Sequence, residues 1–201
     1  ALFEALRENT VLTELNLGRN NIGPNGVEEL PKSLHDSYNT NTTLISLDLS
    51  HNQIVNEGAK KVAKVLIGGS ELVSVNLYDT SIGDDGARAL GVAIDRNYFL
   101  KELNLGSNKI GDKGAEALAK GLMENEDLKK LDLRSNKIGN EGARALSEAL
   151  IHGKTVINTL YSKGNLIGTY EREILAKAFK RNQIANDLNF SVITAGELVK
   201  G

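Results

Sequence analysis

Residues 100–127 read LKELNLGSNKIGDKGAEALAKGLMENED, and the next 28 residues, 128–155, read LKKLDLRSNKIGNEGARALSEALIHGKT. Half of the aligned positions are identical. The pattern recurs on both sides of this pair, in units that begin 28 residues apart, at Leu44, Leu72, Leu100, Leu128 and Val156. A fixed period between about 20 and 50 residues is the signature of a solenoid, in which each unit packs against its neighbours.

Each unit combines the periodicity of a strand with that of a helix. Leu103 and Leu105 alternate with polar residues, which predicts a short strand with one buried side. Ala115, Leu118 and Leu122 recur at spacings of three and four, which predicts a helix with one buried face. Strands pack about 4.8 Å apart and helices about 8–10 Å apart, so a stack of such units must curve. The sequence therefore predicts an α/β solenoid, with a concave parallel sheet inside and convex helices outside.

The opening of each unit follows the pattern L-x-x-L-x-L-x-x-N-x-I-G, as in Leu100, Leu103, Leu105, Asn108, Ile110 and Gly111. This pattern resembles a leucine-rich repeat of the ribonuclease-inhibitor-like subclass, which also occurs in Ran GTPase-activating proteins and in the sensor domains of NOD-like receptors. The resemblance covers nearly the whole chain and implies a leucine-rich-repeat solenoid, a right-handed β-α superhelix. It also implies that the asparagines hydrogen-bond to loop backbone and stack into a ladder. That column consists of Asn20, Asn52, Thr80, Asn108, Asn136 and Asn165, and we expect Thr80 to weaken one rung.

A short polar residue stands just ahead of several predicted helices, as at Asp84, Asp112 and Asn140. Such a side chain can accept hydrogen bonds from the backbone N–H groups that the first turn of a helix leaves unpaired. We therefore expect each of these residues to cap the helix that follows it.

The whole chain, residues 1–201, is expected to form a single leucine-rich-repeat domain. Residues 1–11 match the second half of a repeat helix, residues 12–184 contain six repeats, and residues 185–201 form a partial C-terminal repeat or a cap. The first repeat is longer than the others, and its additional residues fall within 35–43, where we expect a protruding loop. Pro31 lies well inside the helix of this repeat and predicts a kink or a late helix start.

Composition excludes several classes of function. The formal net charge is −2, which argues against a general role in nucleic-acid binding. The chain has no cysteine, so disulfides, thiol nucleophiles and cysteine metal sites are excluded, and a reducing compartment such as the cytoplasm fits. No apolar run approaches the roughly 20 residues that a transmembrane helix needs. We therefore expect a cytoplasmic monomer that does not contact nucleic acid or membrane.

No arrangement of residues in the sequence points to catalysis. His35, His51 and His152 lie in different repeats, and none has a carboxylate or serine at the spacing of a known motif. Phosphate-binding loops, zinc-binding spacings and nucleophile elbows are all missing from the sequence. The sequence thus predicts a protein that is not an enzyme and that has no cofactor and no metal site.

The outward columns of the predicted strands vary from repeat to repeat, and a varying column is free to serve a partner. One column reads Glu14, Ser46, Ser74, Glu102, Lys130, Thr159, and the next reads Asn16, Asp48, Asn76, Asn104, Asp132, Tyr161. The face is acidic in the early repeats and becomes basic in the late ones. We expect partner contacts at Asp48, Tyr78, Asp79, Glu102, Lys130, Asp132, Arg134, Tyr161 and Lys163. Tyr78, Arg134 and Tyr161 come first, because Tyr and Arg are enriched among residues that dominate interface energy.

For any single one of these residues, a merely solvated sheet surface is an equally good interpretation. For the chain, the leading hypothesis is a protein-interaction module that binds a protein partner on its concave face. One alternative, implied by the resemblance, is a GTPase-activating protein of the Ran-activator type. Another is the ligand-sensing part of a larger receptor or effector.

Overall fold

A computed structural model describes residues 2–34 and 43–185 of the chain. Within these residues, six short parallel strands form one sheet, in which the strand order follows the order of the chain. The strands are β1 (Glu14–Asn16), β2 (Ser46–Asp48), β3 (Ser74–Asn76), β4 (Glu102–Asn104), β5 (Lys130–Asp132) and β6 (Thr159–Tyr161).

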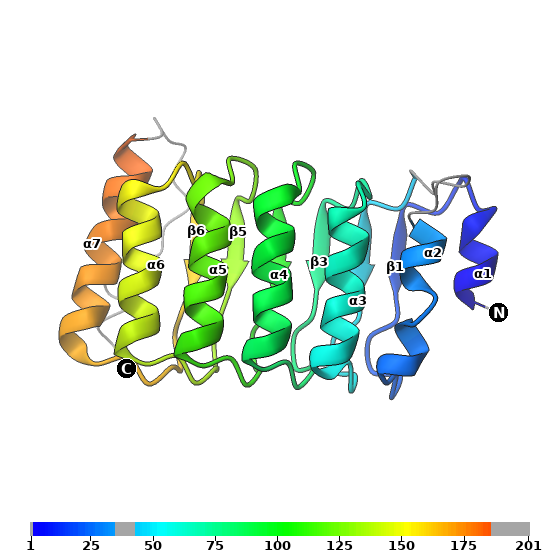
Figure 1. The fold of residues 1–201 in the computed structure, drawn as a ribbon, viewed down its shortest axis with the longest axis horizontal. Helices are drawn as coiled ribbons and strands as arrows, with labels where there is room; N and C mark the ends of the chain where they lie inside the picture. Colours follow the sequence, from blue (N-terminus) through cyan, green and yellow to red (C-terminus); the bar gives the residue numbers. More distant parts are fainter. Residues whose placement is uncertain (1, 35–42, 186–201) are drawn as a thin grey trace.

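Helices cover one side of the sheet and form a single row along the stack (Figure 1). They are α1 (Leu2–Arg7), the 3-10 helix η1 (Pro24–Val27), α2 (Leu30–Leu34), α3 (Val55–Ile67), α4 (Asp84–Arg96), α5 (Asp112–Glu124), α6 (Asn140–His152) and α7 (Thr169–Ala185). This alternation of strand and helix confirms the predicted α/β solenoid.

The core lies between the sheet and the row of helices, as the two periodicities predict. Leu103 and Leu105 are fully buried on the sheet side. Ala115, Leu118 and Leu122 face them from α5 and are likewise buried. A continuous cluster of such residues runs through the stack from Phe3 to Phe179. Burial of this stripe, which no single repeat achieves alone, is what stabilises the fold.

The asparagine ladder is present, and four of its rungs, at Asn52, Asn108, Asn136 and Asn165, each join two repeats. Asn108 Oδ1 accepts hydrogen bonds from the backbone N–H groups of Thr80 (3.1 Å) and Ile82 (2.9 Å) in the preceding repeat. Its amide nitrogen Nδ2 donates to the carbonyl oxygens of Leu77 (2.8 Å) and Leu105 (3.0 Å). Asn52, Asn136 and Asn165 likewise satisfy the turn of the repeat before their own, whereas the side chain of Asn20 donates to Gly18 in its own repeat.

Thr80 weakens this ladder, as expected. Its hydroxyl donates to the carbonyl of Leu77 in its own repeat (2.7 Å) and contacts Asn108 Oδ1 (3.2 Å). Within the described residues, the side chain of Thr80 makes no bond to the second repeat. A backbone bond from Val55 N–H to the Thr80 carbonyl (2.9 Å) joins the two turns instead. Val55 adopts a φ of 51°, a left-handed conformation that strains a β-branched residue.

The predicted capping of each helix by its own polar residue is wrong. The N-cap of α5 is Gly111, without a side-chain cap bond, and Asp112 is the first helical residue. Asp112 Oδ1 instead accepts from the backbone N–H groups of Gly139 (2.7 Å) and Gly142 (2.9 Å), at the start of the next helix. The Asp112 side chain, which belongs to the first turn of α5, thus caps the adjacent helix α6. Asp84 does the same for Gly111 and Gly114, and Asn140 for Gly168.

The two ends of the chain agree only partly with the expectations. Residues 1–11 do contain a short helix, α1. Pro31 is the second residue of α2, so the helix of the first repeat starts late, after the separate helix η1. The expected protruding loop falls on residues 35–42, outside the described residues. Helix α7 continues through Ala185, and residues 186–201 also lie outside the described part. None of the described helices is long and apolar enough to cross a membrane.

Candidate functional site

The variable columns do lie side by side on one face of the sheet, opposite the helices. The register pairs Glu102 with Lys130, and it pairs Asn104 with Asp132. Lys130 in turn pairs with Thr159, as the sequence columns predict. We call this surface the sheet face. Its residues come from six different repeats, so a single partner can contact all six repeats at the same time.

Arg134 is the most firmly held side chain on the sheet face. Its Nε donates to both carboxylate oxygens of Asp132, at 3.1 and 3.0 Å, and its Nη2 donates to Asp132 Oδ2 at 2.5 Å. The guanidinium carbon lies 4.7 Å from the centroid of the Tyr161 ring, in a cation–π contact. Both neighbours restrict the rotamers of Arg134 before any partner arrives, which reduces the entropy lost on binding.

Of the three residues that the sequence analysis ranked first, Arg134 and Tyr161 are in contact, whereas the Tyr78 ring meets the ring of His51. Tyr78, two repeats before Arg134, leans over Gly106, where an added β-carbon would lie 2.9 Å from the ring atom Cδ2. The missing side chain at Gly106 thus leaves room for the Tyr78 ring. The hydrogen bonds that Arg134 donates to Asp132 raise the pKa of Arg134, and Coulombic interactions with Asp132, Tyr161 and Tyr78 act in the same direction. The guanidinium therefore keeps its positive charge.

Asp132 plays a different part from the one that the sequence indicated. Only 4% of its side chain is exposed, because Arg134 covers it. Its Oδ1 also accepts from the backbone N–H of Arg134 at 2.9 Å. Asp132 is therefore placed to orient Arg134 from below, and the surface that a partner would meet is the guanidinium.

Charged residues of the other columns also pair among themselves. Lys130 Nζ lies 3.2 Å from Glu102 Oε2, with both side chains about half exposed. Lys163 is exposed and has no ion pair within the described residues. Together with Arg134, Lys130 and Glu102 border a hollow of about 320 Å³ in the sheet face. The hollow is lined by Ser74, Val75, Asn76, Glu102, Leu103, Asn104, Lys130, Asp132, Arg134 and Tyr161.

A second polar cluster lies on the early repeats. His51 Nδ1 is 2.9 Å from Asp79 Oδ2, and His51 Nε2 is 3.3 Å from Arg19 Nη2. The His51 ring also meets the Tyr78 ring edge to face, at 5.3 Å between centroids. Arg19 and His51 were not among the expected site residues, although they occupy the same column as Asp79. The sequence did contain a sign of this cluster, because the column of Arg19, His51 and Asp79 places a cation, an imidazole and a carboxylate in adjacent repeats.

Asp48 lies close to this second cluster but does not join it. It accepts a hydrogen bond from Asn76 Nδ2 at 3.0 Å and another from the backbone N–H of Ser50 at 2.8 Å. Eight of the nine expected residues therefore fall into two groups. Asp48, Tyr78 and Asp79 belong to the early repeats, and Glu102, Lys130, Asp132, Arg134 and Tyr161 line the hollow. Lys163 lies outside both groups.

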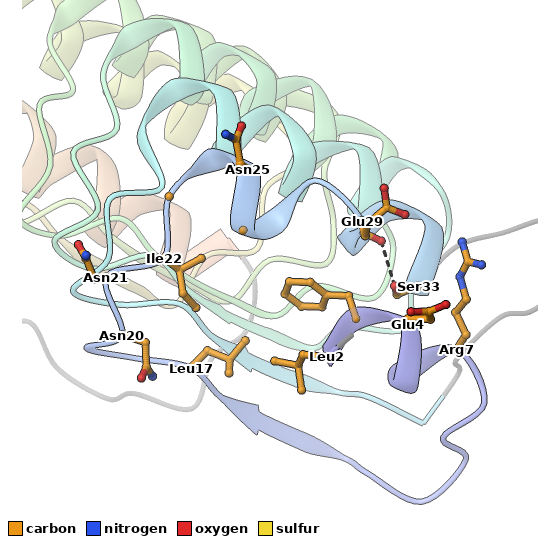
Figure 2. A pocket seen from close by; sticks show the side chains of 13 residues that line it. Leu2, Glu4, Arg7, Leu17, Asn20, Asn21, Ile22, Asn25, Glu29 and Ser33 are labelled. Atoms are coloured by element: carbon orange, nitrogen blue, oxygen red, sulfur yellow. Dashed lines mark hydrogen bonds between the residues drawn. The ribbon is translucent and has the colours of Figure 1, made fainter.

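A larger hollow lies elsewhere, at the N-terminal end of the stack, and holds about 650 Å³ (Figure 2). Leu2, Leu17 and Ile22 point toward one another there, between α1 and the turn that follows β1. Glu29, one of its two acidic lining residues, has a lowered pKa because Lys32, close by on α2, donates a hydrogen bond to it. None of the expected site residues lines this hollow. In the part of the chain that the structure describes, no cluster of His, Cys, Asp and Glu could hold a metal ion.

Comparison with known proteins agrees with this architecture. A family profile described as Leucine Rich repeat matches residues 8–30, 40–63, 96–119 and 124–147. No curated protein matches the sequence.

Two solved structures have a similar fold. The leiomodin-1 structure titled "Actin-Binding Site 2" has a TM-score of 0.63 and 18% identity, over 92% of this chain and 89% of that one. The tropomodulin C-terminal domain of Caenorhabditis elegans has a TM-score of 0.50 and 16% identity, over 91% of this chain and 92% of that one. The chain therefore contains leucine-rich repeats in the matched residues, and it shares its fold with the leiomodin and tropomodulin domains.

Proposed function

We propose that this chain is a protein-binding module that holds its partner on the sheet face. The observation that carries the proposal is the contact between Arg134 and Tyr161 beside the hollow, with Tyr78 over Gly106 on the same face. Asp132 and Tyr161 hold the arginine in place. Tyrosine and arginine anchors grouped near the centre of a polar surface are typical of the residues that dominate binding energy.

Charge on the sheet face supports a single orientation of the partner. Asp48, Asp79 and Glu102 lie toward the early and middle repeats, and Arg134 and Lys163 lie toward the late ones. A partner with a basic region and an acidic region would align with this gradient. Such complementarity contributes mainly to specificity and to the association rate.

Affinity capture from a cell lysate, followed by mass spectrometry, would test the proposal. Purified actin is a sensible first partner, because the similar leiomodin structure is titled an actin-binding site. Arg134→Glu should weaken capture and reduce its sensitivity to salt. Lys120→Glu, on the exposed side of α5, is the matched control and should have little effect. Equal losses from the two variants, or a larger loss from Lys120→Glu, would place the binding surface on the helices.

We also propose that the chain works by binding and not by catalysis, and that its repeats belong to the ribonuclease-inhibitor-like subclass. The 28-residue period supports the second statement. A panel of small GTPases would test the first, because a Ran-activator type of protein would accelerate their GTP hydrolysis. Acceleration that Asn104→Ala abolishes would favour that alternative. The monomeric state, the cytoplasmic location and the ligand-sensing alternative stay predictions from the sequence.

A further inference from the structure

The way in which Asp132 holds Arg134 leaves one edge of the guanidinium available. Asp132 occupies the side formed by Nε–H and one N–H of Nη2. A guanidinium carries five N–H donors in a fixed, planar fork. The opposite edge, formed by Nη1 and the other N–H of Nη2, meets no hydrogen-bond acceptor among the described residues. About half of the Arg134 side chain is exposed, so a partner can reach this edge.

The surroundings of Arg134 favour a singly charged, planar ligand. Around the hollow, the positive charges of Arg134 and Lys130 are balanced by the negative charges of Asp132 and Glu102. A site without net charge has little to offer a phosphate dianion, whose affinity depends mainly on Coulombic attraction. A carboxylate can bind at a site with little net positive charge, because two parallel N–H hydrogen bonds from the free edge of Arg134 match its two oxygens.

The adjacent groups also suit a carboxylate that is carried on a peptide. The hollow holds about 320 Å³, and the amide side chains of Asn76 and Asn104 line it. Asn76 Oδ1 and Asn104 Oδ1 already accept the backbone N–H groups of Tyr78 and Gly106, and Asn76 Nδ2 donates to Asp48. The second N–H of Asn76 and the two N–H groups of Asn104 can donate to a neighbouring peptide carbonyl. Tyr161 lies beneath the guanidinium and offers the apolar surface against which a side-chain methylene would pack.

We propose that the free edge of Arg134 binds the carboxylate of an aspartate or glutamate side chain that the protein partner inserts into this hollow. This inference rests on the proposed function of the sheet face, and it names the chemistry of the central contact. The partner is thus expected to carry an acidic side chain at the centre of its binding surface, flanked by peptide backbone.

Matched short peptides test the carboxylate directly by NMR, using the protein labelled with ¹⁵N. The probes are Ac-Gly-Glu-Gly-NH₂, its glutamine counterpart and its phosphoserine counterpart. The glutamate peptide should shift the Arg134 Nε–H signal and the backbone signals around Tyr161 in a saturable manner. The glutamine peptide should shift neither. Equal shifts from both peptides, or tighter binding of the phosphoserine peptide, would overturn the proposal.

Two arginine variants control for charge and for folding. Arg134→Lys keeps the positive charge but loses the bidentate pair of N–H donors. It should lower the affinity for the glutamate peptide about tenfold. Arg144 is the matched control, since its two terminal nitrogens already bond to Glu141 and Glu171 on the helix side. Arg144→Lys should leave the peptide affinity unchanged. An unchanged affinity in Arg134→Lys, with the backbone spectrum intact, would refute the proposed contact.

This experiment separates failure of the inference from failure of the proposed function. If wild-type protein and Arg134→Lys capture the same partner equally well, the sheet face binds protein but the carboxylate contact is wrong. If the glutamate peptide binds at Arg134 and captured proteins bind only the helix side, the site recognises small carboxylates and the inference about a protein partner fails.

Discussion

Replacement of Asp112 by alanine should destabilise the helix that follows in the next repeat, and not its own. Asp112 Oδ1 accepts two backbone N–H groups at the start of α6, at 2.7 and 2.9 Å. Loss of a capping side chain costs about 0.5–2 kcal/mol, and the carboxylate also loses its favourable interaction with the helix dipole, about 0.3–1 kcal/mol. We therefore expect Asp112→Ala to lower the free energy of unfolding by about 1–3 kcal/mol in a urea titration.

Hydrogen exchange locates the effect. The amides of Gly139 and Gly142 should exchange faster by a factor of about 5–150 in Asp112→Ala, because a loss of about 1–3 kcal/mol corresponds to such a ratio. Asp112→Asn keeps the acceptor and should retain most of the protection, as Asn140 does for Gly168 in the next pair of repeats. Lys113→Ala, an exposed neighbour, is the control. Faster exchange at the start of α5, with α6 unaffected, would refute capping between repeats.

Three further predictions concern the core, the weak rung and the histidine cluster. Leu105→Ala should cost about 2–5 kcal/mol in a denaturant melt because it leaves a cavity, whereas Tyr78→Ala should stay within about 1 kcal/mol. The reverse order would mean that the inward and outward columns are misassigned. Val55→Gly should raise stability by about 0.5–1 kcal/mol, since relief of left-handed strain (about 1–2 kcal/mol) exceeds the added chain entropy (about 0.5–1 kcal/mol); a lower melting point would contradict this. The neutral His51 ring should carry its proton on Nδ1, because Arg19 can only donate to Nε2. Imidazole ¹⁵N shifts that report the other tautomer would count against this geometry.

Much of the fold could be predicted from the sequence because its determinants repeat. The alternation at Leu103 and Leu105 and the helical spacing at Leu118 and Leu122 each fix one buried side, and neighbouring units confirm the register. The direction of capping could not be predicted in this way. Asp112 stands at the right place in the sequence to cap its own helix. It caps α6 instead, because its side chain lies within hydrogen-bonding distance of the start of that helix, a relation that only the packing of α5 against α6 determines.

The candidate site shows the same division. Column positions predicted which side chains share the sheet face, since the register of a parallel sheet follows from the repeat. They could not predict that Asp132 would be covered by Arg134, because burial of one side chain by another depends on rotamers. The pairing of His51 with Arg19 was missed for a similar reason, as the contact depends on the left-handed backbone at both positions.

The hydrogen bonds between repeats also bear on how such a chain can lengthen or shorten. Asn108 serves the repeat before it, and Asp112 serves the repeat after it. A duplicated unit therefore brings one side-chain acceptor for the backbone N–H groups of each neighbour, and it finds matching backbone groups on both sides. Insertion of a whole unit leaves every turn and helix start satisfied, whereas removal of part of a unit exposes groups on two repeats at once. Changes in the length of this stack are thus expected in whole steps of 28 residues.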